Sequence, residues 1–244
     1  MKTLFKLIFG LLFIVLIIIV LAGGYFGLIP GVSKLFGSDK PRDLGVQGSD
    51  ADYASASAKG IQFVALQKDS VSRPAETRKI TGSKAVSTSF TAQELTALMN
   101  KKPTWIYNPV SDVQFKFNPD GTGEVSGILR IDRLTRYAQA SGMSQQEVQK
   151  VLDYLKITNA NPAFYLKGSV SVVDGTMNLD AQRVEVGRFP VPLSIIADNK
   201  GRVISFVENK IFQIPGLSVK SLRIEQGQLQ FEGTLPEVIA SVSD

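Results

Sequence analysis

The residue types that most often perform catalysis are missing from this sequence, which contains no histidine and no cysteine. Their absence excludes Ser-His-Asp and Cys-His nucleophiles, histidine acid–base catalysis and most zinc sites. A Ser-Lys pair exists formally at Ser83 and Lys84, but no nucleophile elbow or Ser-x-x-Lys motif surrounds it. We therefore expect no catalytic residue, no metal site and no cofactor.

Carboxylate pairs are the remaining formal possibility for catalysis. Most of the candidate acids fall in expected turns or on strand faces that should meet water, so a soluble surface explains them better than acid–base chemistry. These acids are Asp112, Asp120, Glu124, Asp132, Asp174 and Asp180. There is also no Walker A loop and no Gly-x-Gly-x-x-Gly motif. The sequence indicates a protein that is not an enzyme.

Basic residues are in excess, with a net charge of +5. Arg130, Arg133 and Arg136 recur every third residue, which on a helix would form a narrow stripe. Such a stripe would suit anionic lipid headgroups or wall polymers, at about 1 kcal/mol for each basic group near an anionic surface. An ordinary solvated helix face is the simpler explanation. Nucleic acid is not an expected partner, because no basic-aromatic platform is present.

Alternating apolar residues predict the strands of the domain. Phe90–Leu95 has the capping box and hydrophobic staple of a helix start, with Thr91 as the N-cap. Val113 to Phe117 alternates as a half-buried strand, Asn118–Gly121 has turn chemistry, and Glu124–Arg130 is the expected partner strand.

The same order recurs twice. A capping box at Ser144–Glu147 predicts a helix carrying Val148, Val151, Leu152 and Leu155. A hairpin follows, with Asp174-Gly175 as its turn and strands over 164–172 and 177–186. In the third unit the apolar residues have helical spacing over 203–211, and strands are expected over 217–224 and 229–235 with a turn at Gln226-Gly227. The alternation of apolar residues changes phase between Val219 and Leu222, which indicates a bulge. Residues 198–201 fit a hairpin turn equally well.

Three helix–strand–turn–strand units predict an α+β fold, in which a curved antiparallel sheet of long hairpins packs on helices. Such a sheet either closes on its own core or leaves an elongated apolar groove, and the pattern leaves both open. Core packing is the simpler explanation of its large apolar residues. If a groove exists, the candidates to line it are Phe115, Phe117, Phe164, Leu166, Val170, Met177, Leu179, Leu229 and Phe231.

No charged residue lies between Lys6 and Lys34, and most of that interval is Leu, Ile, Val and Phe. A bilayer core needs about 20 apolar residues as helix, so residues 1–29 are expected to form an uncleaved transmembrane anchor with the rest of the chain outside the cytoplasm. A cleaved signal peptide is the main alternative. Residues 30–60, rich in Gly and Ser, read as a flexible linker, with a short helix over 51–59 as the other possibility. Residues 61–244 form the expected extracytoplasmic domain.

Several sequence segments resemble those of a known family: Val186–Pro192 after a long hairpin, Ile214–Val219 leading into Leu229–Leu235, and the expected early helix Phe90–Asn100. Through these segments the chain resembles single-pass extracytoplasmic proteins of Gram-positive bacteria that are similar to tubular lipid-binding (TULIP-like) domains. The resemblance covers roughly Ser83 to Pro236. The resemblance implies a long sheet curled around a helix, with an apolar channel for acyl chains. It brings no ligand motif that can be assigned to particular residues.

Two functions are therefore expected. The first is non-enzymatic binding or handling of membrane lipid in the cell envelope. The second is an anchored interaction module that docks an envelope or membrane protein. Gly23-Gly24 and Gly27 in the apolar segment would permit close helix approach in such a complex.

Overall fold

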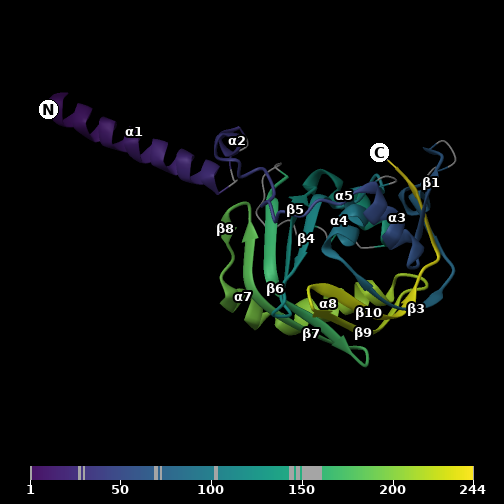
Figure 1. Cartoon of the computed structure of the whole chain (residues 1–244). Coiled ribbons are helices and arrows are strands. Elements are labelled where there is room, and N and C mark those ends of the chain that lie inside the picture. The colour runs from purple at the N-terminus through teal and green to yellow at the C-terminus, as the bar shows by residue number, and fades with distance from the viewer. Residues whose placement is uncertain are drawn as a thin grey trace.

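The chain folds into helices and two β-sheets, the larger of which curls strongly into a half-barrel (Figure 1). This computed structural model describes residues 2–26, 29, 31–68, 71, 73–101, 104–142, 146, 149 and 161–243; side chains are described for all of these except 2–13, 206 and 210–212. The α+β class and the curved antiparallel sheet of hairpins are confirmed. The predicted apolar face of the second helix, Val148, Val151, Leu152 and Leu155, lies outside the described residues.

The larger sheet pairs its strands in the order β3-β10-β9-β6-β5-β4, with β7 beside β6 and β8 beside β7. β6 is the centre of this arrangement: its residues 163–168 pair with β5, whereas only Val172 and Val173 pair with β9. The strands β5 and β4 therefore leave β6 at one point, and the strands β9, β10 and β3 leave it at another. A concave face forms between these two groups of strands. The strands are β3 (Lys84–Phe90), β4 (Val110–Phe117), β5 (Gly123–Leu129), β6 (Ala163–Val173), β7 (Thr176–Val186), β8 (Phe189–Pro190), β9 (Ser218–Glu225) and β10 (Gln228–Leu235).

The three predicted hairpins are present, and their turns have the expected geometry. Asp174 and Gly175 have φ of 48° and 78°, and Gln226 and Gly227 have φ of 52° and 73°. Two successive residues with positive φ are what a tight two-residue hairpin loop requires. The predicted bulge is also confirmed, because the β9–β10 register shifts so that the backbone pairing skips Lys220. Bulges increase local twist, which helps the sheet to curl.

A smaller sheet was not predicted from the sequence. It places the C-terminal strand β11 (Val238–Val242) between β1 (Gln62–Leu66), to which it is parallel, and β2 (Arg78–Thr81), to which it is antiparallel. A 3-10 turn, η2 (Pro74–Thr77), leads into β2. Because β1 and β11 are far apart in sequence, their pairing joins the two ends of the domain.

The predicted capping box at Thr91 is confirmed. It begins α4 (Ala92–Asn100), where the Thr91 side chain accepts from Glu94 N and Glu94 Oε2 accepts from Thr91 N. Residues 51–59 are helical rather than irregular, since α3 (Asp50–Ala58) has its own capping box at Ser49. α3 packs on α4 and contributes Ala56 to a buried core cluster that also contains Phe90, Phe231 and Leu235.

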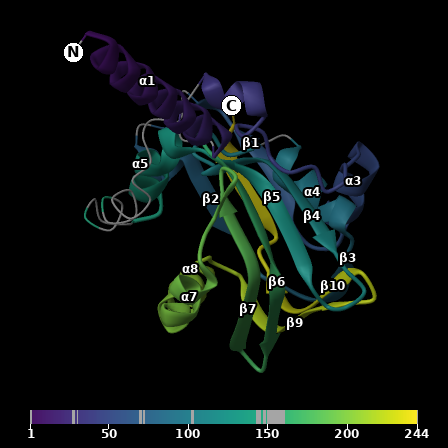
Figure 2. The ribbon, with the colours of Figure 1, turned by 90° about the vertical axis from the view of Figure 1, so that its left-hand side faces the viewer.

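Three further helices are α5 (Ile131–Ala140), α7 (Leu193–Asp198) and α8 (Lys200–Phe212). Residues 198–201 therefore join two helices and are not a hairpin turn. The α7–α8 pair contacts β7, where Met177 N donates to Glu208 Oε1 at 3.3 Å. Figure 2 shows this pair beside β7, on the opposite side of the molecule from α3 and α4.

The N-terminal helix α1 (Lys2–Tyr25) extends away from the sheets and is followed by α2 (Val32–Phe36) (Figure 1). A search of the described residues finds no helix with both the length and the apolar character needed to cross a bilayer. The anchor expected over 1–29 stays a prediction. At its end, α1 meets the domain through an edge-to-face contact of Phe26 with Phe189 and a hydrogen bond from Ser38 Oγ to Tyr25 O.

Candidate functional site

An apolar groove of about 500 Å³ lies on the concave face of the larger sheet. Strands β4, β5, β6, β7, β9 and β10 all contribute to its wall. Six of the nine sequence-predicted lining residues are in this wall: Phe115, Phe117, Leu166, Val170, Leu179 and Leu229. They face one space because alternate residues of a strand share a face and the sheet curls toward that face. The structure therefore has the groove that the sequence pattern left undecided.

The other three predicted lining residues lie elsewhere. Phe231 is 7% exposed and packs in the core with Phe90 and Leu235, as the simpler explanation expects. Met177 is also buried. Phe164 lies opposite Gly127 of β5, where a Cβ on the glycine would come within 2.9 Å of the Phe164 ring.

Helices bound the groove on two sides. Leu95 of α4 lines one part, and Ile196 of α7 with Val203 of α8 line another. Beside them, Leu193 and Ile195 of α7 are also well exposed. Exposed apolar side chains gathered around a concavity are typical of a ligand-binding or interaction site.

Two glycines allow the strands to approach within the groove. A Cβ on Gly168 would lie 2.2 Å from the carbonyl oxygen of Asp180, and one on Gly123 would lie 2.8 Å from Ile224 Cδ1. Gly168 is also the site of the register shift between β6 and β7. Gly168 is therefore a point at which the backbones of β6 and β7 approach too closely for a side chain.

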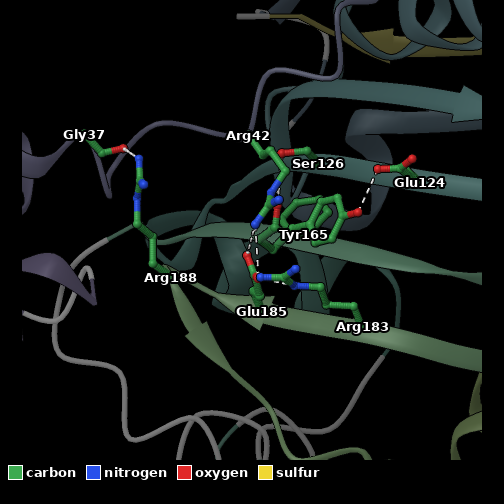
Figure 3. Close-up of polar contacts among 9 residues, drawn as sticks. Gly37, Arg42, Glu124, Ser126, Tyr165, Arg183, Glu185 and Arg188 are labelled. Carbon is green, nitrogen blue, oxygen red and sulfur yellow. Dashed lines mark hydrogen bonds and ion pairs between the residues drawn. The ribbon is translucent and has the colours of Figure 1, made fainter.

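A polar cluster lies beside the groove, where Arg42 contacts Tyr165 of β6 and Glu185 of β7, and Tyr165 in turn contacts Glu124 of β5 (Figure 3). The carboxylate of Glu185, only 6% exposed, accepts from Arg42 Nη2 at 2.8 Å and from Arg183 Nε. The Arg42 guanidinium lies 4.2 Å from the centroid of the Tyr165 ring, and the Tyr165 hydroxyl donates to Glu124 Oε2 at 2.7 Å. The cluster therefore ties the segment before α3 to the sheet.

Burial and hydrogen bonding together shift the pKa of two groups in this cluster, Glu124 and Tyr165. Burial acts to raise the pKa of Glu124, but hydrogen bonds from Tyr165 and Asn118 outweigh it and hold that pKa below its ordinary value. Burial, with the hydrogen bond to Glu124, raises the pKa of Tyr165 to about 12. Near neutral pH the tyrosine is therefore neutral and donates a hydrogen bond to a charged carboxylate.

The three arginines proposed for a membrane surface do not form one helical stripe. Arg130 precedes α5 as its N-cap residue and pairs with Asp132 at 2.8 Å. Arg133 and Arg136 do lie on α5, where Arg136 is exposed. A role for them at a membrane surface stays a prediction.

Sequence reasoning missed the polar cluster because its members are distant in the chain. Arg42 and Glu185 are separated by 143 positions. Arg42 also lies in a segment whose composition suggested a linker, so no local signal pairs it with a strand residue.

Comparison with models of protein families, with curated proteins and with solved structures returned no match for this chain. Evidence about its function therefore comes from the geometry and chemistry of the chain itself.

Proposed function

We propose that this protein is a non-enzymatic lipid-binding protein, held at the outer face of a membrane by residues 1–29, which takes up acyl chains in the groove of the larger sheet. The observation that carries the proposal is the apolar groove of about 500 Å³ on the concave face. Cavities of about 300–1,000 Å³ are the usual size for small ligands. A TULIP-like channel, the family expectation, is a long apolar cavity of the same general kind.

The hydrophobic free energy favours the binding of even a single acyl chain. Each methylene buried from water contributes about 0.8 kcal/mol, so about ten methylenes in the groove contribute about 8 kcal/mol, which corresponds to micromolar affinity before the cost of association. A groove open on one side suits an elongated flexible ligand, which can enter sideways without unfolding the sheet.

The membrane part of the proposal is supported by the surface of α1. Every residue from Ile14 to Leu21 is a large aliphatic with a substantially exposed side chain. A surface of this kind is unfavourable in water and is stabilised by contact with lipid or with another apolar surface.

The test is lipid capture by the full-length protein, purified in a detergent and exchanged into an amphipathic polymer. Native mass spectrometry would then detect bound lipid, and displacement of a fluorescent fatty acid would measure affinity. Leu166→Gln places an amide in the groove at a position already 40% exposed, so the fold tolerates it. We expect this variant to retain less lipid and to bind the fatty acid more weakly.

The matched control is Val173→Gln on the same strand, at a position 59% exposed and outside the groove. It should bind as the unchanged protein does. Purification without lipid, together with no fatty-acid binding by the unchanged protein, would overturn the proposal. Retention of a stoichiometric protein partner in that same preparation would instead favour the interaction module.

A further inference from the structure

Arg78 is a cationic side chain at the edge of an apolar space, without an acidic partner among the described residues. Its Nε atom is buried and makes no hydrogen bond. Its guanidinium lies 5.2 Å from the centroid of the Trp105 ring, which is within range of a cation–π contact. Burial also lowers the pKa of Arg78. The Arg78 residue as a whole is half-buried, and a guanidinium that has lost part of its water normally has a carboxylate or another acceptor, because desolvating an unpaired charge is costly.

The one acid in the turn before β2 is already engaged. Glu76 of η2 pairs with Arg73, three residues before it. The cavity that Arg78 lines has no aspartate or glutamate in its described wall. The guanidinium is therefore available to an anion from outside the chain.

This second cavity has a volume of about 430 Å³ and is built mainly from apolar side chains. Phe63 and Ile239, paired across β1 and β11, line it together with Leu98 of α4. Leu95 and Phe115 line both this cavity and the groove of the larger sheet. The two spaces thus share a wall, and a ligand head at Arg78 has apolar surface leading from it toward the groove.

The aromatic wall beside Arg78 is held in place by its own contacts. Trp105 Nε1 donates to Thr77 Oγ1 at 3.0 Å, and the Trp105 ring packs edge-to-face on Tyr137 with centroids 5.7 Å apart. Trp105 is 9% exposed. A ring that is fixed in this way cannot turn to fill the space in front of the guanidinium.

We propose that Arg78 binds the anionic head group of an amphiphilic ligand whose alkyl tail passes Leu95 and Phe115. The inference rests on the proposed lipid-binding function and adds the class of lipid: one that carries a carboxylate or a phosphate. Both groups match the planar donor fork of a guanidinium, which forms two parallel hydrogen bonds with either.

The experiment compares three ligands that share one alkyl tail: dodecanoate, dodecyl phosphate and the neutral dodecanol. Each is titrated into the full-length protein in an amphipathic polymer and followed by calorimetry and by the fluorescence of Trp105, the single tryptophan. Arg78→Met removes the charge while keeping an apolar side chain of similar length. Lys79→Met is the matched control, because Lys79 is the exposed neighbour on the same strand.

We expect Arg78→Met to weaken binding of the preferred anionic ligand on the order of 10- to 100-fold, as loss of a charge-assisted hydrogen bond does. Dodecanol binding should be unchanged in both variants, and Lys79→Met should bind all three ligands normally. The anion whose affinity falls more in Arg78→Met than in the unchanged protein, dodecanoate or dodecyl phosphate, identifies the head group as carboxylate or phosphate. Acetate and inorganic phosphate should bind far more weakly than the tailed anions, because they lack the apolar contacts.

A second variant covers the case in which Arg78→Met does not fold, which thermal unfolding would reveal. Arg78→Lys keeps the charge but loses the planar fork, and it should show a smaller loss for the same anion. Equal anion affinity in the unchanged protein and in a folded Arg78 variant would overturn this inference. The proposed function would still stand if Leu166→Gln weakened the binding of all three ligands. If none of the three ligands binds the unchanged protein, both proposals fail.

Discussion

Replacing Glu94 by glutamine should destabilise the protein strongly, because this carboxylate joins the C-terminal part of α3 to the start of α4. Its oxygens accept from Lys59 Nζ at 2.6 and 2.7 Å, from Ser55 Oγ at 2.6 Å and from Thr91 N at 2.8 Å. The Glu94 side chain is 5% exposed, whereas that of Lys59 is 26% exposed. The contacts link α3 to the start of α4, and so they connect the segment before the domain to its core.

The magnitude follows from the partner that is left behind. Removing one member of a buried ion pair costs about 3–5 kcal/mol, since the other charge stays uncompensated. Lys59 keeps some contact with water and still donates to Ser89 O at 2.8 Å. We therefore expect Glu94→Gln to lower the free energy of unfolding by about 3 kcal/mol, the lower end of that range. Glutamine can still accept from Thr91 N, so loss of the helix cap contributes little.

Urea unfolding followed by the fluorescence of buried Trp105 measures this loss. Lys59→Met and the double variant complete a cycle. The double variant should lose less stability than the two single variants combined, by at least about 1 kcal/mol, because it leaves no unpaired buried charge. A loss below about 1 kcal/mol for Glu94→Gln, or strictly additive effects, would refute the reasoning.

The same pair predicts a pH dependence. Burial acts to raise the pKa of Glu94, but the hydrogen bonds from Lys59, Ser55 and Thr91 outweigh it, and the pKa is lowered in the folded protein. A lowered carboxyl pKa contributes stability that is present above the ordinary value and is lost as the pH falls through the folded value. Stability should therefore decline on acidification, and the decline should be shallower in Glu94→Gln.

Two further predictions concern the larger sheet. Gly168→Ala should cost about 3 kcal/mol, because its Cβ would lie 2.2 Å from the backbone oxygen of Asp180, which cannot move without disturbing the β6–β7 pairing. Thermal unfolding tests this, with Gly201→Ala in α8 as the control; nothing lies within 4 Å of that position, and a gain of about 0.5–1 kcal/mol is expected there. Tyr165→Phe should cost about 1.5 kcal/mol through loss of the hydrogen bond to Glu124. Since the Tyr165 pKa is raised to about 12, this stabilisation should persist below the ordinary tyrosine value and vanish as the pH rises through the folded value. Ultraviolet titration should show a phenol that ionises near pH 12 in the unchanged protein and is lost in the variant, and an unchanged titration curve would contradict the assignment.

Much of the fold was predictable because its signals are local. The Thr91 capping box, the Asp174-Gly175 turn and the bulge near Lys220 each depend on residues within a few positions of one another. Capping needs a side-chain oxygen three residues from its donor, and a tight turn needs residues that accept positive φ. The smaller sheet was not predictable in this way, since β1 and β11 come from opposite ends of the domain.

By itself the sequence determined the hairpins, their turns, the apolar face of each strand and the lack of histidine and cysteine chemistry. Only the tertiary structure decided that this face stays partly open as a groove, that Phe231 belongs to the core, and that Arg78 meets Trp105 beside a second cavity. The physical reason is the range of the interactions. Alternation assigns a residue to a face of its strand, but how far the sheet curls, and which distant helix covers it, depends on contacts between residues that the chain brings together only on folding.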